Sequence, residues 1–117
     1  MLQQKDTLGK KGEALVYAYL KNKGYKIIAK NYKNFLGEID IIAKDKDYLV
    51  FIEVKTRMSR AFGDPLEAVN KEKQFKIRQV ATMYLKAKRM LDSNCRFDVI
   101  AVLGDDFEDI RHIENAF

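Results

Sequence analysis

The chain has 117 residues, of which 47% are hydrophobic and 33% charged, a composition that favours one folded domain and excludes a disordered or collagen-like chain. Its net charge of +5 favours a polyanionic partner, although many basic domains bind nothing anionic. The single cysteine and single histidine exclude an intramolecular disulfide framework, a cysteine-rich zinc site and most histidine-based metal sites.

Signals for membrane insertion or secretion are absent from the sequence. No apolar run reaches the roughly 18 residues of a transmembrane helix, and the residues that follow Met1 lack the apolar core of a signal peptide. The lone cysteine fits a reducing compartment. We therefore expect a cytoplasmic protein that makes no use of a membrane, and any hydrolytic chemistry in it would depend on carboxylates, lysine and a metal ion.

The first predicted element is a helix over residues 8–22, where apolar residues recur at spacings of three and four. Asp6 or Thr7 is the expected N-cap, and Gly24 stands where a helix is normally followed by glycine. The predicted buried stripe consists of Leu8, Gly12, Leu15 and Tyr19, widened by Val16 and Leu20.

Three strands are predicted next, over residues 25–32, 36–43 and 48–56. The last two contain β-branched runs, and the polar residues 44–47 between them predict a hairpin with a four-residue turn. Residues 57–69 are predicted as a loop.

A second helix is predicted over residues 70–91, with Asn70 as its N-cap. A buried-type strand over 96–103 follows, with a short edge strand over 109–113. The helix's predicted apolar stripe is Ile77, Val80, Ala81, Tyr84 and Leu85, extended by Leu91. The order predicts an α/β (α+β) fold in which residues 1–117 form one domain, with helices packed on a mixed sheet.

Three charged residues interrupt the two most apolar strands: Asp40, Glu53 and Lys55. A charge in a buried strand is costly unless it is paired or bound to a metal. If Ala43 pairs with Tyr48, Asp40 faces Phe51 and Glu53 is its diagonal neighbour; a shift of two residues places Asp40 directly opposite Glu53. In both registers the two carboxylates and the ammonium share one face.

Two close carboxylates raise each other's pKa, and a divalent cation such as Mg²⁺ or Mn²⁺ removes the repulsion. Mg²⁺ binds a few protein carboxylates and completes its shell with water and phosphate oxygens, which suits phosphodiester hydrolysis. Lys55 would orient the attacking water or neutralise developing charge. The competing interpretation is a solvated strand face with a weak ion pair, which is the usual meaning of Glu-x-Lys.

Glu13 is the next candidate, because Gly12 beside it indicates close approach of the first helix to the sheet; a surface glutamate is the alternative. The second helix has a basic polar face, which predicts phosphate contacts or an ordinary solvated surface. The candidate nucleic-acid contacts are Lys71, Lys73, Lys76, Arg57, Lys10 and Lys11.

Several other polar and aromatic residues carry weaker signals. Tyr32, Phe35 and Phe62 have rings that can stack on bases, although core packing is the favoured interpretation for each. His112 is predicted at the surface, and Asp98 is predicted to pair with Arg96 or a backbone donor.

At this point the sequence resembles a known superfamily. Gly37-Glu38-Ile39-Asp40 and Phe51-Ile52-Glu53-Val54-Lys55 look like the core of the PD-(D/E)XK nucleases, although Ile39 stands where the proline of that name would be. Across nearly the whole chain the sequence looks more closely like the YraN family of small bacterial endonuclease-like proteins. The further matching segments are Gly9-x-x-Gly12-Glu13, Phe62-Gly63-x-Pro65-x-Glu67-Ala68-Val69, Lys73, Tyr84-Leu85 and Arg96-Phe97-Asp98-Val99.

The resemblance implies a restriction-endonuclease-like three-layer core in the order α-β-β-β-α-β. It also implies that Asp40 and Glu53 are metal ligands, that Lys55 is the catalytic lysine and that Glu13 completes the site, either as a further metal ligand or by positioning a water. A homodimer is suggested by the dimeric resolvases of the superfamily.

Three hypotheses follow. The first is a Mg²⁺- or Mn²⁺-dependent endonuclease for DNA, favoured over RNA, acting in repair, recombination or processing. The second is a nucleic-acid-binding module or adaptor of the same fold without turnover. The third is a protein-interaction subunit with a relic site, against which the retained charges of Asp40, Glu53 and Lys55 argue.

Overall fold

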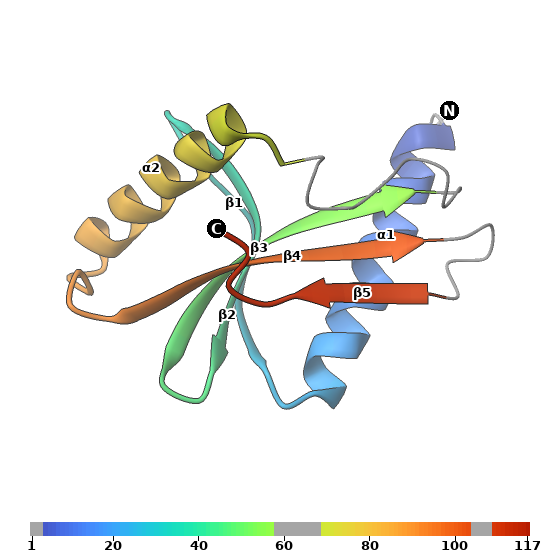
Figure 1. The fold of residues 1–117 in the computed structure, drawn as a ribbon, viewed down its shortest axis with the longest axis horizontal. Coiled ribbons are helices and arrows are strands. Elements are labelled where there is room, and N and C mark those ends of the chain that lie inside the picture. Colours follow the sequence, from blue (N-terminus) through green and yellow to red (C-terminus); the bar gives the residue numbers. More distant parts are fainter. Residues whose placement is uncertain (1–3, 58–68, 104–108) are drawn as a thin grey trace.

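The computed structural model describes residues 4–57, 69–103 and 109–117. The elements are α1 (Gln4–Asn22), β1 (Lys26–Asn34), β2 (Gly37–Asp45), β3 (Tyr48–Arg57), α2 (Lys71–Ala87), β4 (Asn94–Leu103) and β5 (Asp109–Ile113). Their strands form one sheet in the order β1-β2-β3-β4-β5 (Figure 1). β3 and β4 are parallel, and the other neighbours are antiparallel. The predicted α+β mixed sheet, including its short edge strand, is confirmed.

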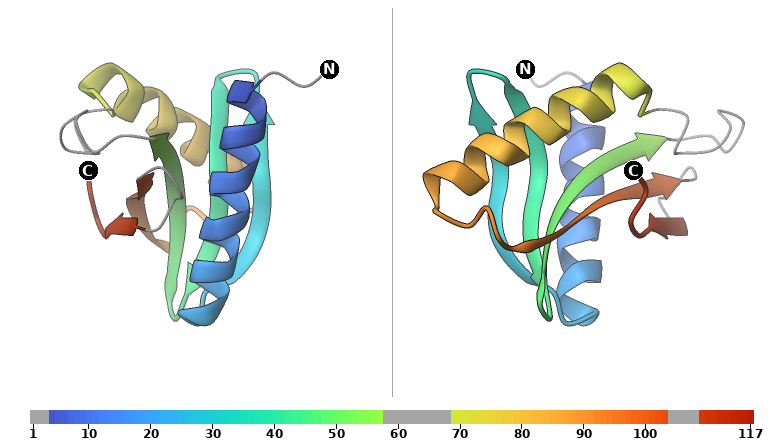
Figure 2. Two further views of the ribbon diagram at one scale, coloured as in Figure 1. Left: turned by 90° about the vertical axis from the view of Figure 1, so that its right-hand side faces the viewer. Right: turned by 60° about the vertical axis from the view of Figure 1, so that its left-hand side comes forward.

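The two helices cover opposite faces of this sheet (Figure 2). One core cluster joins the buried face of α2 to residues such as Ile42, Phe51 and Val99. The other joins α1 to residues such as Ile41, Val50 and Ile100. Neighbouring residues of a strand belong to different clusters: Ile41 packs toward α1 and Ile42 toward α2. The fold therefore has three layers, and the central strands are apolar on both faces because both faces are covered by a helix. Neither helix of the described chain is long and apolar enough to span a membrane.

The first helix begins earlier than predicted, and fewer of its apolar residues are buried against the sheet than the sequence pattern suggests. Asp6 and Thr7 lie inside α1, so their assignment as N-cap is wrong. Val16 and Leu20 are fully buried, whereas Leu15, assigned to the stripe, is exposed. The helix ends as predicted at Asn22, and Gly24 follows it with a positive φ of 93°, a conformation that glycine adopts without strain.

The predicted buried stripe of α2 is confirmed at Ile77, Val80, Ala81, Tyr84 and Leu85. Asn70 caps the helix, because its side chain accepts from the backbone N–H of Lys73 at 2.9 Å. The helix ends at Ala87 rather than at residue 91, and Arg89 takes a positive φ of 56° just beyond it. Leu91 is therefore exposed and does not extend the stripe. Most of the predicted loop, residues 58–68, lies outside the described residues.

The hairpin between β2 and β3 has a tighter turn than predicted. Asp45 pairs with Tyr48 and Ala43 with Val50, so the turn consists of Lys46 and Asp47 alone. Lys46 has a φ of 54°, which a two-residue hairpin turn of this kind requires. Pairing of Ala43 with Tyr48 is therefore wrong, and the register shifted by two residues is the one that forms.

The sheet divides between β2 and β3. These strands pair only from Asp45↔Tyr48 to Ile41↔Ile52. Beyond that point β2 continues beside β1 as far as Gly37↔Asn34, while β3 continues beside β4 as far as Arg57↔Leu103. Figure 1 shows the two halves diverging. Polar side chains at the division can thus be approached from both layers of helix.

Helix α1 touches the diverging half of β3 through a glycine. A Cβ atom added to Gly12 would lie 2.3 Å from Oγ1 of Thr56. No ordinary contact between non-bonded atoms is so short, so only glycine lets the helix backbone lie this close to the strand. This is the packing reason expected for Gly12.

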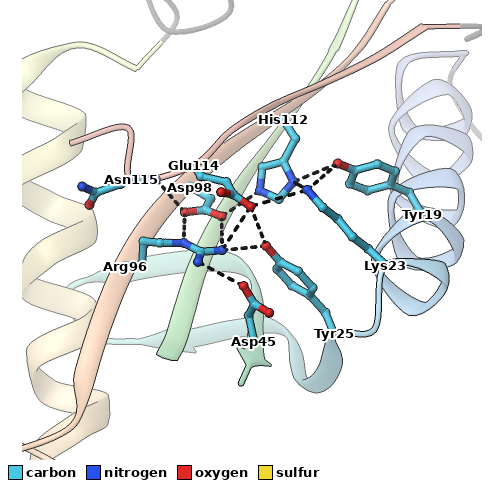
Figure 3. Close-up of polar contacts among 9 residues, drawn as sticks. All are labelled: Tyr19, Lys23, Tyr25, Asp45, Arg96, Asp98, His112, Glu114 and Asn115. Atoms are coloured by element: carbon cyan, nitrogen blue, oxygen red, sulfur yellow. Dashed lines mark hydrogen bonds and ion pairs between the residues drawn. The ribbon is translucent and has the colours of Figure 1, made fainter. Parts of the chain in front are cut away.

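A buried carboxylate, Asp98, fastens the last strand to the sheet (Figure 3). Asp98 is fully buried and accepts two hydrogen bonds from Arg96, each of 3.0 Å. It also accepts from the backbone N–H of Asn115 at 3.0 Å and lies 2.7 Å from Nε2 of His112. Because a carboxylate only accepts, Nε2 carries the proton. Both predicted partners, Arg96 and a backbone donor, are confirmed.

The same network reaches α1 through the histidine. Nδ1 of His112 lies 3.0 Å from the hydroxyl of Tyr19 and 3.4 Å from Nζ of Lys23. Lys23 also pairs with Glu114 at 3.4 Å. The prediction that His112 lies at the surface is wrong, because β5 carries it under α1, and no local pattern in the sequence shows that long-range contact.

Substitution of Gly12 by alanine should destabilise the protein, although alanine favours helix. The added methyl group meets Thr56, and overpacking of this kind costs about 1–3 kcal/mol. Gly9→Ala is the matched control, because its Cβ would meet nothing within 4 Å and should stabilise α1 by up to ~1 kcal/mol. Urea denaturation measures both changes. Equal effects of the two substitutions would rule out the close approach at Gly12.

Asp98→Asn should destabilise the fold by about 3–5 kcal/mol, because it removes the fully buried negative charge that pairs with Arg96 and turns an amide NH₂ toward the donors of Arg96 and His112. Asp45 also contacts Arg96, at 3.1 Å, but is partly exposed. Asp45→Asn should therefore cost less than about 1 kcal/mol. Thermal and urea unfolding of both variants test the difference, and a loss no greater for Asp98→Asn than for Asp45→Asn would contradict it.

Candidate active site

Asp40 and Glu53 are the first residues beyond the last β2–β3 pair, one on each diverging strand. Continuation of the register would place them directly opposite each other, as the second of the two predicted registers has it. Oδ2 of Asp40 accepts a hydrogen bond of 2.8 Å from the backbone N–H of Val54. A side-chain oxygen thus takes the place of a backbone acceptor at the point where the strands separate.

Glu53 is 8% exposed and lies between two ammonium groups. Its Oε1 is 3.6 Å from Nζ of Lys55 and 3.1 Å from Nζ of Lys73. The contact with Lys55 confirms that residues two apart on β3 share a face. The contact with Lys73 was not anticipated, because Lys73 was assigned only to phosphate binding.

The cap of α2 explains how Lys73 reaches Glu53. Asn70 accepts the backbone N–H of Lys73 and so fixes the first turn of the helix over β3. The sequence contains the cap signal, but the crossing of α2 over the strand is a tertiary contact that no local pattern records.

Glu13 approaches the site from α1, on the other face of the sheet. Its charge is among those that raise the pKa of Asp40. Burial, the charges of Glu13 and Asp40, and a hydrogen bond with Glu13 raise the pKa of Tyr17. Tyr17 was missed in the sequence, although its spacing of four residues from Glu13 puts both on one helical face.

Electrostatics single out Asp40 among the acidic residues of the sheet. Burial, followed by the negative charge of Glu53, raises the pKa of Asp40 to about 7, against the opposing hydrogen bond from Val54. The charges of Glu13 and Glu38 contribute further. Near neutral pH this carboxyl group therefore takes up and loses a proton readily.

The two site lysines differ in how firmly they hold their protons. Burial lowers the pKa of Lys55, the neighbouring Lys73 lowers it further, and Glu53 pulls in the opposite direction. Burial also opposes the charge of Lys73, but its contacts with Lys55 and Glu53 raise the pKa of Lys73. Lys55 therefore releases a proton before Lys73 does.

Asp40, Glu53 and Lys73 border a pocket of ≈ 280 Å³ between the start of β2 and the first half of α2. Asp40, Glu53 and Lys73 lie on its wall together with Lys76, which also pairs with Glu72 at 3.7 Å. The remaining lining residues are Leu36, Gly37, Glu38, Ile77 and Val80. Glu38 was quoted only as part of a motif, yet it borders the pocket.

The other predicted contacts lie farther out. Lys71, Lys10 and Lys11 are exposed, and Arg57 is partly buried at the end of β3, where it donates to the carbonyl of Thr56 at 3.1 Å. Their role in nucleic-acid binding stays a prediction.

Core packing was the favoured interpretation for three aromatic residues, and it holds for one of the two that the structure describes. Tyr32 packs edge-on against Tyr84 with a centroid distance of 5.1 Å, as core packing predicts. Phe35 is 82% exposed, so core packing is wrong for it. Phe62 lies outside the described residues.

The donor set suits a hard cation only in part. Within residues 4–57, 69–103 and 109–117, no three His, Cys, Asp or Glu side chains form a group that could hold a metal ion. Asp40 and Glu53 remain as a pair of carboxylates whose repulsion a cation would relieve. Mg²⁺ characteristically takes one or two protein carboxylates and fills its shell with water and phosphate oxygens, so the pair fits.

The three-layer fold, with its mixed sheet between two helices, is the one that the resemblance to the PD-(D/E)XK-like class implies. A model of the uncharacterised protein family UPF0102, the YraN family, matches residues 12–102, and the chain belongs to this family.

Relatives resemble the chain over nearly its full length. A UPF0102 protein of Alkaliphilus oremlandii is 55% identical over 113 residues, covering 94% of this chain and 97% of that protein. One from Clostridium acetobutylicum is 48% identical over 112 residues, covering 93% and 92%. One from Chlorobium phaeobacteroides is 48% identical over 117 residues, covering 94% and 93%.

Asp40→Asn should stabilise the metal-free protein, and increasingly so as the pH rises. Asp40 has a pKa of about 7 when folded, above its ordinary value of 3.8, so the folded state binds this proton more tightly. The stabilisation is complete below about pH 4 and is lost as the pH rises to about 7. Asparagine has no such loss and still offers an oxygen to Val54, so its advantage should grow by on the order of 4 kcal/mol between pH 4 and pH 8.

Urea denaturation in EDTA at several pH values measures this difference. Asp40→Ala is the control, because it removes the charge and also the acceptor, which leaves the Val54 N–H unpaired at a cost of about 1–3 kcal/mol. A constant difference between Asp40→Asn and the unsubstituted protein from pH 4 to pH 8 would contradict the raised pKa.

Proposed function

We propose that the protein is a metal-dependent endonuclease that hydrolyses phosphodiester bonds of DNA, with Asp40, Glu53 and Lys55 as the central residues of its site. The observation that carries the proposal is the placement of Asp40 and Glu53 where β2 and β3 separate, with Lys55 3.6 Å from Glu53. A role in DNA repair, recombination or processing belongs to the same proposal.

Asp40 and Glu53 would hold Mg²⁺ or Mn²⁺, which lowers the pKa of water and neutralises charge on phosphate oxygens. The support from the chain is electrostatic. Without a cation, the charge of Glu53 raises the pKa of Asp40. A cation between the two carboxylates would let both be ionised near neutral pH, which is the state in which carboxylate oxygens bind metals.

The other polar side chains of the site would orient water, stabilise charge and bind the substrate's phosphates. Lys55 orients the attacking water and stabilises the negative charge that develops on the phosphate oxygens. Glu13, close enough to influence Asp40 from α1, positions water at the side of the site opposite α2. Lys73 and Lys76 on the pocket wall hold phosphate groups of the substrate, for which lysine is a common donor.

The second candidate function is nucleic-acid binding without cleavage, and the contact between Lys73 and Glu53 favours it. Lys73 lies 3.1 Å from Glu53 and already neutralises that carboxylate. A site whose acidic residue is satisfied by lysine can bind a phosphate backbone without holding a metal. An assay must therefore separate binding from cleavage.

Cleavage is tested with labelled single-stranded, duplex and four-way-junction DNA in Mn²⁺, Mg²⁺ or EDTA. We expect cleavage only with metal, and a loss of about 10²–10³-fold in Lys55→Ala, which is the usual cost of removing one group that stabilises developing negative charge. Lys86→Ala removes the same charge from an exposed position in the last turn of α2 and should cleave normally.

The metal itself has a readout that does not require activity. Mn²⁺ should raise the melting temperature of the unsubstituted protein at pH 8 and should not raise that of Asp40→Asn. DNA binding that weakens steeply with salt, with no cleavage and no thermal shift in Mn²⁺, would replace the nuclease by the binding module.

A further inference from the structure

A second groove lies on the outer side of α2, beside the candidate active site. Its volume is ≈ 380 Å³, and its lining residues are Leu36, Phe75, Arg78, Gln79, Thr82 and Met83. Leu36, in the turn between β1 and β2, also borders the pocket that contains Asp40 and Glu53. The two hollows therefore share a wall and lie side by side.

The groove combines exposed apolar surface with polar and cationic groups. Phe75 is 62% exposed, and Phe35, next to Leu36 in the turn, is 82% exposed. A large apolar side chain left in water at such a place indicates a binding surface. Arg78 and Gln79 supply hydrogen-bond donors and an amide acceptor at the same groove.

The surroundings favour a nucleic acid as the occupant. Lys76 stands on the pocket wall beside the groove, and α2 also carries Lys71 and Lys73, within a chain whose net charge is +5. A polyanion whose phosphates follow these lysines would bring its neighbouring bases to the outer side of the helix. Aromatic side chains beside a basic track are the usual means of holding single strands.

We propose that this groove binds an unpaired base of a DNA strand whose backbone occupies the adjacent site, with Phe75 stacking on the base. The inference rests on the proposed function and narrows its substrate to DNA with unpaired nucleotides beside the phosphate that is attacked. In a duplex the faces of the bases are covered by their neighbours, so only an unpaired or extruded base offers a free face to Phe75.

Binding to three fluorescein-labelled DNA ligands in EDTA tests the groove without cleavage. The ligands are a short single strand, the same strand in a blunt duplex, and an abasic strand of equal length and charge. Phe75→Ala should weaken single-strand binding roughly 5- to 100-fold, as loss of one stacked base does. Binding of the duplex and of the abasic strand should not change.

Three further variants separate stacking from apolar contact. Phe75→Tyr keeps an aromatic face and should bind the single strand normally, whereas Phe75→Leu keeps apolar bulk alone and should bind as weakly as Phe75→Ala. Leu15→Ala removes an exposed apolar side chain on α1 and should have no effect. The slope of log affinity against log salt should stay the same in all four variants, because none of them removes a phosphate contact.

Several outcomes would overturn the inference. Normal single-strand binding by Phe75→Leu, or equal losses for single strand and duplex, would exclude stacking. RNA of the same sequence that binds more tightly and loses more in Phe75→Ala would assign the groove to RNA. A dimer seen by sedimentation that Phe75→Ala dissociates, with DNA binding unchanged, would assign it to a second copy of this chain.

Failure of this inference is distinguishable from failure of the proposed function. If the unsubstituted protein neither binds the DNA ligands nor cleaves DNA with metal, the proposed function fails and the inference falls with it. If it binds them and cleaves DNA with metal while Phe75→Ala behaves normally, only the base-binding groove is excluded.

Discussion

The hydrogen bond from the backbone of Val54 to Asp40 lies at the point where the central sheet divides. Up to Ile41↔Ile52 the two strands satisfy each other's backbone; beyond it, β2 stays with β1 and β3 stays with β4. A backbone donor at such a division needs another acceptor, and Asp40 supplies one. The same carboxylate is thereby held beside Glu53, so one contact completes the sheet and orients the site.

The pKa values of two aspartates of the sheet, Asp98 and Asp40, are shifted in opposite directions. Asp98 is fully buried, yet hydrogen bonds from His112, Arg96 and the Asn115 backbone overcome the effect of burial and lower its pKa. For Asp40, burial and the negative charge of Glu53 outweigh the single backbone hydrogen bond from Val54, so its pKa is raised. Asp98 is a structural ion pair with its charge satisfied in place, whereas Asp40 still gains from a further cation.

The sequence predicts a feature of this structure well when the residues that determine the feature are close together in the chain. Local signals were sufficient for the stripe of α2, the cap at Asn70 and the glycine after α1. The sequence allows two hairpin registers, because residues 44–47 can form a four-residue turn, whereas the structure forms a shorter turn with a positive φ at Lys46. Shifting by two residues preserves the face of every side chain, so the convergence of Asp40 and Glu53 was predicted despite the wrong turn.

Long-range contacts account for the errors at His112 and Leu15 and for the unpredicted partner of Lys73. The side chain of His112 is only 4% exposed, because β5 brings it beside Tyr19, a residue 93 positions away in the chain. Leu15 is exposed because α1 meets the sheet along Gly12, Val16 and Leu20, a narrower face than its apolar residues suggest. Lys73 was recognised as basic but not as the partner of Glu53, since that pair depends on how α2 crosses β3.

The site draws its charges from both outer layers, and this follows from the division of the sheet. A continuous sheet would separate α1 from α2 completely, and Glu13 would be screened from the residues that face α2. Because β2 and β3 diverge, Glu13 influences Asp40 from one side while Lys73 contacts Glu53 from the other. Gly12 keeps α1 close enough for this, since any larger residue would meet Thr56. The spacing between the helices thus sets the balance of negative and positive charge at the site.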